Sequence, residues 1–291
     1  MVIVKLLGGL GNQLFQYAIA RHLAIINDTE VLLDTTAFED FYKLHKYSLQ
    51  HFSIKATIAK RTQLEAVYNF PHNLTRLQRL WQSRILGKKN FHLIEEQFNY
   101  QPNIIKKYAG NVSIDGYWQT EKYFLEIADM LRQELKIITS SEKEDIKVLQ
   151  NIQKTDSVSL HIRRADYTNP ETALIHGLCS IEYYQEAVKN IADKIPNPTF
   201  FIFSDDITWA EENLKLDFPM VFVGHNNADK NYEDLRMMST CQHHIIANSS
   251  FSWWGAWLNP NPNKVVIAPQ KWFSTNERNY QDVVPNNWIK L

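Results

Sequence analysis

Residues 158–167 have the sequence VSLHIRRADY, which indicates the fold class of the second half of the chain. Apolar and polar residues alternate in it, so we predict a β-strand whose Leu160 and Ile162 face a hydrophobic core. His161 and Arg163 share the opposite face, and Arg163 stands where the strand ends. Polar residues at the carboxyl end of a buried strand are candidates for a ligand site.

The rest of the second half repeats this pattern of a short apolar run followed by polar residues. Further runs end at Ser204–Asp206, Gly224, Asn248 and Pro269. Apolar residues at helical spacing lie between most of them, over Ile181–Ile191, Thr208–Leu214 and Tyr232–Thr240. Short strands alternating with helices predict βαβ units, a parallel sheet and an α/β fold.

Two adjacent arginines, Arg163 and Arg164, follow the first of these strands. A guanidinium group holds phosphate oxygens with two parallel hydrogen bonds, so the pair suits an anionic ligand such as a diphosphate. The alternative is an internal ion pair in which Asp166 neutralises Arg164. Both hold if the two side chains face opposite ways.

The first half opens with a predicted strand, Val2–Leu7, followed by the glycine loop GGLGNQ at residues 8–13 and a helix over Leu14–Ile26. A second strand over Val31–Leu33 ends at Asp34. Glycines between a strand and a helix let the backbone approach an anion at the helix N-terminus. We predict a loop that contacts a phosphate or a sugar through Gly9, Gly11 and Asn12. A dinucleotide site and a purely structural turn remain alternatives, although the third glycine of the dinucleotide fingerprint is missing.

The division between the two halves is predicted from a helix start near residue 141. Phe124, Ile127, Leu131 and Leu135 are spaced as the buried face of a helix over residues 121–135. Ser141 and Glu144 then form a capping box for a further helix. We therefore predict two domains, residues 1–150 and residues 151–291.

A serine-rich turn follows the strand that ends at Asn248. The hydroxyl groups of Ser249 and Ser250 and the backbone amides up to Phe251 suit a pyrophosphate. Simple capping of the helix that follows is the alternative interpretation. The tryptophans at 253, 254 and 257 are predicted to belong to the core.

The sequence FSDD at residues 203–206 places two carboxylates at another strand end. Because they are adjacent, alternation points them to opposite sides, and no Asp-x-Asp pair occurs in the chain. A metal-dependent site therefore has no obvious ligand pair. One aspartate of the pair would face the ligand side and accept hydrogen bonds from a guanine base, while the other caps the helix that follows.

Composition excludes several classes of protein. The formal net charge of −1 argues against binding to nucleic acid. The two cysteines form neither a disulfide framework nor a metal site, and no apolar run reaches the roughly 18 residues that span a bilayer. The apolar N-terminus turns at once into the glycine loop, so we expect no signal peptide and a cytoplasmic location.

Residues 60–90 are basic, with one acidic residue among them. Leu74, Leu77 and Trp81 are spaced to form an apolar stripe on a helix. Such a helix predicts peripheral contact with the anionic inner face of the cytoplasmic membrane. A solvated helix packed on the sheet is the alternative.

Four motifs occur in one order along nearly the whole chain: GGLGNQ, HIRRADY, FSDD, and ANSSFSWWGAWLNP followed by VVIAP. In this respect the chain resembles the GDP-fucose-dependent α-1,2-fucosyltransferases of glycosyltransferase family 11. The resemblance implies a GT-B-like α/β architecture of two Rossmann-like domains with the active site in the cleft between them. Residues 1–150 would be the acceptor-side domain, and residues 151–291 would bind the GDP-sugar. It also implies an inverting transfer of L-fucose to the 2-hydroxyl of a terminal galactose, without metal or cofactor.

The resemblance also implies roles for individual residues. Arg163 would hold the β-phosphate of GDP-fucose, His161 and Asp205 would contact guanine, and Ser249, Ser250 and Phe251 would hold the diphosphate. The acceptor would be a galactose-containing oligosaccharide or a lipid-linked glycan. The catalytic base is open, because Asp166 and Glu171 are both close to the arginines in sequence.

Two other functions remain alternatives at this point. Another nucleotide-sugar glycosyltransferase could use the same scaffold, and binding of GDP, UDP and CDP sugars would distinguish it. A carbohydrate-binding protein without catalytic activity would bind fucose without GDP and would not need two arginines at a strand end.

Overall fold

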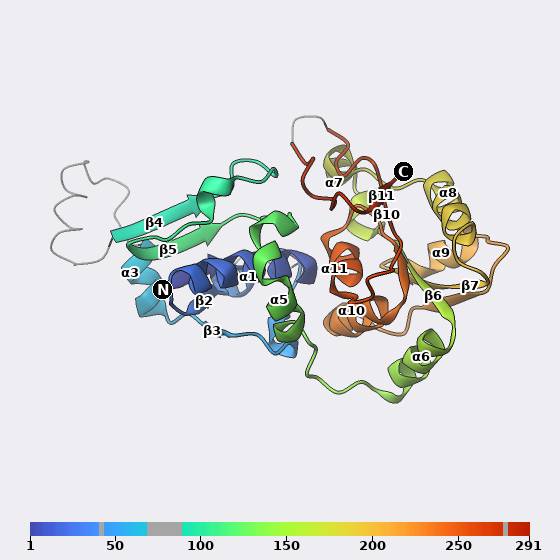
Figure 1. The fold of residues 1–291 in the computed structure, drawn as a ribbon, viewed down its shortest axis with the longest axis horizontal. Helices are drawn as coiled ribbons and strands as arrows, with labels where there is room; N and C mark the ends of the chain where they lie inside the picture. The colour runs from blue at the N-terminus through green and yellow to red at the C-terminus, as the bar shows by residue number, and fades with distance from the viewer. Residues whose placement is uncertain (41–43, 69–88, 276–278) are drawn as a thin grey trace. The chain divides into compact units, whose positions relative to one another are not determined.

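The computed structural model describes residues 1–40, 44–68, 89–275 and 279–291. The chain forms two compact units, Met1–Lys136 and Ile137–Leu291, each built on a parallel sheet (Figure 1). The boundary that we expected after residue 150 falls inside helix α6, Lys143–Lys154. Ile152 of α6 packs with core residues of the second unit, so α6 belongs to that unit and the division comes before it.

The first unit holds a parallel sheet in the order β3-β2-β1-β5-β4. Its strands are β1 Val2–Lys5, β2 Val31–Asp34, β3 Ala56–Ile58, β4 Lys89–Ile94 and β5 Gly110–Asp115. Its described α-helices are α1 Leu10–Ile26, α2 Thr36–Asp40, α3 Arg61–Tyr68 and α5 Ala128–Glu134. Single turns of 3-10 helix lie at Leu49–His51, Pro102–Ile104, Glu121–Tyr123 and Leu125–Ile127.

The glycine loop is shorter than predicted, because α1 starts at Leu10 and not at Leu14. Gly8 has a positive φ of 87°, and a Cβ atom there would overlap the side-chain nitrogen of Asn12. Gly9 is the N-cap of α1. The chain therefore turns at Gly8 and enters the helix at once.

The helix predicted over residues 121–135 is continuous only in its second half. Two 3-10 turns precede α5, because Phe124 (φ −144°) and Ile127 (φ −114°) leave helical geometry. Phe124 is fully buried and its ring lies 6.0 Å from that of Phe15. Tertiary packing of this side chain overrides the helical spacing of the sequence.

The capping box that we predicted from Ser141 and Glu144 is wrong by one residue. The Glu142 carboxylate accepts the backbone N–H of Asp145 at the start of α6, and the Asp145 carboxylate accepts the backbone N–H of Glu142. The Ser141 hydroxyl instead donates to Glu233 at 3.0 Å. Spacing found the right place for the helix start but not the residues that form the cap.

The second unit holds a parallel sheet in the order β11-β10-β9-β6-β7-β8. Its strands are β6 Asp156–Ile162, β7 Pro198–Ser204, β8 Met220–Val223, β9 His243–Ile245, β10 Val266–Ala268 and β11 Ile289–Lys290. Besides α6, its α-helices are α7 Pro170–His176, α8 Ile181–Ala192, α9 Ile207–Asn213, α10 Asn231–Thr240 and α11 Ser250–Leu258, with 3-10 turns η5 Ala165–Thr168 and η6 Ala228–Lys230. This is the strand order of a Rossmann fold, and the predicted strand ends and helices of this half are confirmed.

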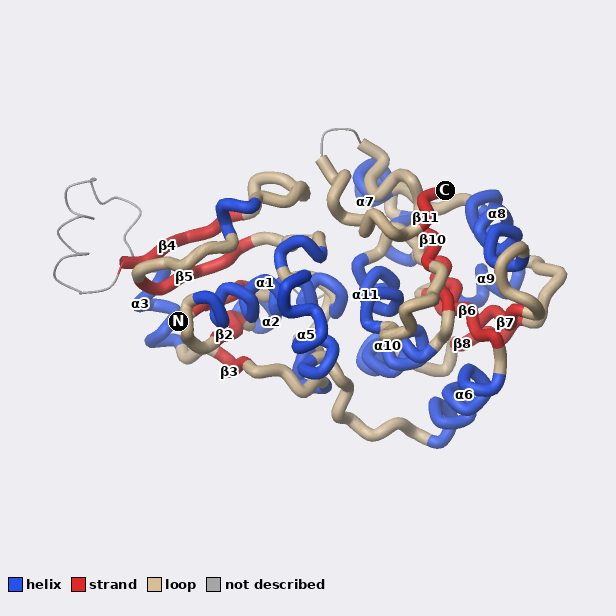
Figure 2. Tube along the Cα trace, in the orientation of Figure 1, coloured by secondary structure: helices blue, strands red, loops and turns tan. Residues whose placement is uncertain are grey.

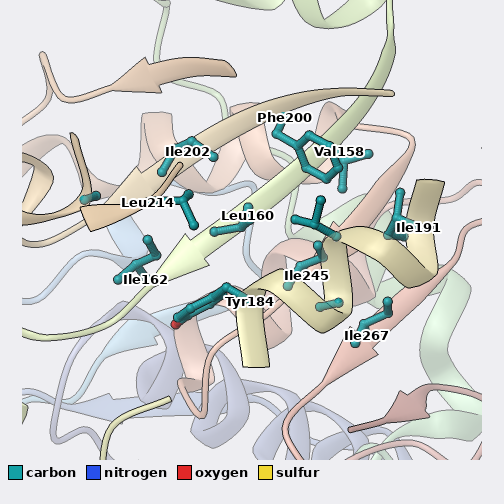
Figure 3. Packing of buried hydrophobic residues seen from close by; sticks show 13 residues of the cluster. Val158, Leu160, Ile162, Tyr184, Ile191, Phe200, Ile202, Leu214, Ile245 and Ile267 are labelled. Carbon is teal, nitrogen blue, oxygen red and sulfur yellow. The ribbon is translucent and has the colours of Figure 1, made fainter. Parts of the chain in front are cut away.

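Helices lie on either side of this sheet (Figure 2). Leu160 and Ile162 of β6 pack with Tyr184 and Ile191 of α8 in one hydrophobic cluster (Figure 3). Residues of β7, α6 and α10 form a second cluster, which includes Phe203. The alternation predicted for β6 is therefore confirmed.

The basic segment that we interpreted as a membrane contact lies largely outside the described residues, which stop at 68 and resume at 89. Of that segment, α3 is described, and its Leu64 and Val67 are buried in the first unit. Among the helices that the structure describes, none has the length and apolar character needed to cross a membrane.

Candidate active site

The strand order of the second unit reverses between β6 and β9, which lie side by side. In an open parallel sheet, ligands bind beyond the carboxyl ends of the strands at such a switch point. Arg163 directly follows β6, and Asn248 and Ser249 follow β9. The topology thus brings two of the predicted motifs together.

Arg163 forms an ion pair with Asp205 that sequence reasoning missed. Ile162 of β6 pairs with Ser204 of β7 in the parallel register, so the next residues along the two strands face each other. Nη1 of Arg163 lies 2.8 Å from Oδ2 of Asp205. The other oxygen, Oδ1, accepts the backbone N–H of Arg164 at 2.8 Å. Asp205 therefore fixes both the side chain of Arg163 and the turn that follows it.

Arg164 is held by different groups. Its guanidinium carbon lies 3.7 Å from the centre of the Trp209 ring, and its Nε is 4.0 Å from the Asp206 carboxylate. Asp206 also caps α9 by accepting the N–H of Trp209, as predicted for one aspartate of the pair. Asp166, the partner that we expected, lies in η5 with its side chain outside the described part of the structure. The two arginines thus have different surroundings. Arg163 is paired with Asp205, whereas Arg164 lies against Trp209 of α9.

His161 is buried at the end of β6, on the same face of the strand as Arg163. Its ring is tilted against that of Phe251, with 5.7 Å between the ring centres. Burial, and secondly the charge of Arg163, lower the pKa of His161 to about 3. Its Nδ1 is buried, with no hydrogen-bond partner in the described residues. His161 is therefore a neutral hydrogen-bonding group and not a source of positive charge.

The serine-rich turn lies at the N-terminus of α11. Ser249 is the N-cap, and its hydroxyl accepts the N–H of Phe251 at 3.3 Å. The capping interpretation is thus confirmed for Ser249, whereas Ser250 occupies the first position of the helix. The following tryptophans are buried, as predicted, with relative exposures of 0%, 0% and 2% for residues 253, 254 and 257.

Tyr167 was quoted in the sequence motif, but no role was predicted for it. The guanidinium carbon of Arg163 lies 5.2 Å from the centre of its ring. The hydroxyl of Tyr167 donates to the backbone oxygen of Asn248 at 3.4 Å. Tyr167 therefore bridges the ends of β6 and β9 across the switch point. The available signal was an aromatic residue in the loop directly after the arginines.

Asn248 fixes the loop after β9. Its Nδ2 donates to the backbone oxygens of His176 at 2.7 Å and of Trp272 at 3.3 Å. The Cys179 thiol donates to its Oδ1 at 3.5 Å, and burial raises the pKa of that thiol to about 11. Cys179 is therefore a structural thiol, as expected, and not a nucleophile.

The candidate bases stay predictions. Glu171 is exposed in the first turn of α7, where its negative charge stabilises the helix. The side chain of Asp166 lies outside the described part of the structure. In the described residues, no group of three or more histidine, cysteine or acidic side chains could hold a metal ion.

The predicted residues Gly9, Gly11 and Asn12 belong to the first unit, so we describe them separately. Gly11 is buried in the first turn of α1, and the Oδ1 of Asn12 accepts Nε2 of Gln119 at 2.8 Å. Two buried glutamines that sequence reasoning missed, Gln13 and Gln16, tie this loop down. Gln13 donates to Gly8 at 3.0 Å and Gln16 accepts the N–H of Leu7 at 3.1 Å.

Comparison with solved structures identifies the fold. A NodZ α-1,6-fucosyltransferase soaked with GDP-fucose matches with a TM-score of 0.50 and 14% identity, over 89% of this chain and 92% of that one. Together with the two parallel sheets, this likeness shows a GT-B-like α/β fold. The expected fold class is therefore confirmed.

Sequence comparison then identifies the family. The family model for glycosyl transferase family 11 matches residues 1–291, so the chain belongs to that family and is a glycosyltransferase. An α-1,2-colitosyltransferase of Escherichia coli is 35% identical over 100% of this chain and 99% of its own length. A galactoside α-(1,2)-fucosyltransferase 2 of Pongo pygmaeus is 23% identical over 88% of this chain and 68% of its own length.

Proposed function

We propose that this protein transfers L-fucose from GDP-fucose to the 2-hydroxyl of a terminal galactose in a glycan, with inversion and without a metal ion. The observation that carries this proposal is the cationic side chain of Arg163, held by Asp205 at the switch point of a Rossmann-type sheet. Membership of family 11 and the galactoside α-(1,2)-fucosyltransferase among its relatives support the donor, the linkage and the acceptor.

The reaction requires a bond to form and a bond to break at the anomeric carbon of fucose. The acceptor oxygen bonds to that carbon as its bond to the β-phosphate oxygen breaks, and GDP leaves with the bonding electrons. The acceptor hydroxyl loses its proton to a base, for which Asp166 and Glu171 remain the candidates. Negative charge grows on the leaving diphosphate, so a fixed guanidinium group accelerates the step.

Arg163 has to serve the diphosphate while it is paired with Asp205. A guanidinium group has five N–H donors, and the described ion pair uses Nη1. A guanidinium group can therefore bind phosphate oxygens while a carboxylate keeps the side chain in place. The charge of Arg164 adds to this field from its place on Trp209.

The nucleoside would use the other groups at the strand ends. His161 contributes a neutral ring with a buried Nδ1 that lacks a partner in the described residues. Asp205 accepts from Arg163 and Arg164 at the same strand end, and a carboxylate in this place suits the N–H donors of guanine. Ser250 and Phe251 are at the N-terminus of α11, where backbone N–H groups favour the diphosphate.

Transfer of colitose is the second candidate function, because the E. coli α-1,2-colitosyltransferase is 35% identical over the whole chain. Colitose is a fucose that lacks the 3-hydroxyl group. A site that hydrogen-bonds this hydroxyl would reject the colitosyl donor strongly, by roughly 10⁴-fold or more, because its polar groups would be left unpaired. A site without such groups would accept both donors at similar rates.

The deciding experiment is an incubation of the protein with GDP-fucose or GDP-colitose and a small panel of β-galactosides. The product linkage is determined by NMR, and each reaction is repeated with excess chelator and with UDP and CDP sugars. We expect an α-1,2-fucosyl galactoside in both the presence and the absence of chelator. Transfer from GDP-colitose alone would establish the second candidate, and an absolute requirement for Mn²⁺ or Mg²⁺ would contradict the metal-free mechanism.

A further inference from the structure

The sheet of the first unit has a switch point of its own. Its order, β3-β2-β1-β5-β4, reverses between β1 and β5, which are parallel neighbours. Because β4 is parallel to β5, the loops that follow β1, β4 and β5 leave the sheet at one edge (Figure 1). Such an edge is a position where open α/β sheets bind ligands.

The turn after β5, residues 116–119, is strained. Gly116 has a φ of 150°, and Trp118 has a φ of 56° although its side chain is bulky and fully buried. A bulky residue in the left-handed region is uncommon and destabilises the chain by roughly 1–3 kcal/mol. Backbone strain of this kind persists where the surrounding structure over-determines it, and it clusters at binding sites.

Two side chains hold this turn in place through three hydrogen bonds. The Glu95 carboxylate, just beyond β4, accepts the backbone N–H of Tyr117 at 2.7 Å and of Trp118 at 2.9 Å. Nε2 of the buried Gln16 donates to the backbone oxygen of Gly116 at 3.1 Å. One carboxylate therefore holds the backbone amides of the strained Trp118 and of Tyr117 before it.

This conformation places two aromatic rings and two amides at the edge. The rings of Tyr117 and Phe98 are stacked, with 6.3 Å between their centres and 12° between their planes, and both side chains are partly exposed. Gln119, at the end of the turn, donates to Asn12 at 2.8 Å and so orients its amide. Aromatic rings with a few fixed polar groups are the usual lining of a site for a small organic ligand.

The charges described at this edge indicate a neutral ligand. Lys5 and Asp115 are paired at 3.2 Å, and the Glu95 carboxylate accepts two backbone amides. The side chains of Tyr117, Phe98, Asn12 and Gln119 are rings and amides, which suit a neutral ligand better than an anion. A sugar ring has apolar C–H faces for the rings and hydroxyl groups for the amides.

We propose that Tyr117, Phe98 and Asn12 form the subsite for the acceptor, with the aromatic pair against a pyranose ring of a galactoside and the Asn12 amide hydrogen-bonded to its hydroxyls. The inference rests on the proposed function for the identity of the sugar. Glu95 and Gln119 are positioning residues in it: one holds the strained turn and the other orients Asn12.

The test compares Tyr117→Ala and Phe98→Ala with Tyr108→Ala as a matched control. Tyr108 is also a partly buried tyrosine beside a phenylalanine, with 5.1 Å between its ring centre and that of Phe91, but it precedes β5 and so lies at the opposite end of that strand. Each variant is assayed for acceptor KM, kcat and affinity for GDP-fucose, and its thermal unfolding is recorded. Binding of a β-galactoside without donor is followed by saturation-transfer NMR.

We expect Tyr117→Ala and Phe98→Ala each to raise the acceptor KM about tenfold and to weaken the NMR signal, with unchanged affinity for GDP-fucose. Tyr108→Ala should change neither. Acceptor KM values equal to those of the control in an active, folded enzyme would overturn the subsite. If the wild type transferred no sugar at all, the proposed function would fail, and the NMR comparison of the variants with the control would still decide the inference. Should an alanine variant unfold, Glu95→Gln and Gln119→Ala, which leave both rings intact, are assayed in its place with the same readouts.

Discussion

The two sheets of this glycosyltransferase have similar topology but different chemistry at their carboxyl edges. In the second unit, the strand ends carry Arg163 and Arg164 with two aspartates in register beside them. In the first unit, the turn after β5 carries the Tyr117 ring, and the first turn of α1 carries the Asn12 amide. Both edges are places where such sheets bind ligands. We infer that topology sets where a ligand binds, whereas the side chains favour an anion at one edge and, on our proposal, a neutral sugar at the other.

The largest expected effect is that of removing the cation from the charged edge. Arg163→Ala should lower turnover about 10²–10³-fold, because charge on the leaving phosphate grows toward the transition state. Arg163→Lys should restore little, since an ammonium group cannot make the paired hydrogen bonds of a guanidinium group. Turnover and GDP affinity are measured for both variants. If Arg163→Ala retained more than about a tenth of wild-type turnover, the phosphate role would be excluded.

The corresponding change at the edge of the first unit's sheet is Gly8→Ala. The backbone at residue 8 has a φ of 87°, which an L-residue rarely adopts, and a Cβ atom there would displace the amide of Asn12. We therefore expect a loss of about 1–3 kcal/mol in the free energy of unfolding. Gly9→Ala is the matched control for stability, because Gly9 has a φ of −70° and its Cβ would meet His45 at an ordinary 3.5 Å. Urea unfolding of both variants is the measurement. Equal stability of the two would show that the turn at Gly8 does not require glycine.

Stability at low pH is a third way to compare the two edges, because His161 stands at the charged one. The pKa of His161 is about 3 in the folded chain and near 6.5 in the unfolded chain. Between pH 6.5 and pH 3 the unfolded chain therefore binds a proton at this residue that the folded chain does not. The folded state should therefore lose up to about 1.4 kcal/mol per pH unit from this group as the pH falls from about 6.5 toward 3.

His161→Gln removes this contribution, so its stability should change less between pH 7 and pH 5 than that of the wild type. Urea unfolding at the two pH values is the measurement. Burial also lowers the pKa of His244, so part of the pH dependence remains in the variant. An identical loss in the wild type and the variant would refute neutral burial of His161.

The smallest effect is expected for Arg164→Ala. Its contact with Trp209 should be worth about 0.5–1 kcal/mol, and the Asp206 carboxylate at 4.0 Å and 40% exposure adds little. The unfolding temperature should therefore fall modestly, and turnover should fall much less than in Arg163→Ala. Calorimetry and steady-state kinetics on the two alanine variants give the comparison. A larger loss of turnover in Arg164→Ala would reverse the roles of the arginines.

Much of the second unit could be predicted from the sequence, because its strands and helices follow strict local periods. The alternation from Val158 to Ile162 is a local property, and the predicted helices agree with α8, α9 and α10 within a residue or two at each end. Predictions failed where a side chain contacts residues that are distant in the sequence. Phe124 breaks a helix to reach the core, and Ser141 donates to Glu233 across the chain and does not cap α6.

The sequence by itself determined the class of fold, the positions of the strand ends and the motifs of the family, because each depends on neighbours in the chain. Only the tertiary structure decided which groups meet. Asp205 faces Arg163 because β6 and β7 are parallel neighbours in a particular register. The sequence of one strand does not determine its register with another. In the same way, Glu95 and Gln16 hold the turn at Trp118 because three segments far apart in the chain end at one edge of a sheet.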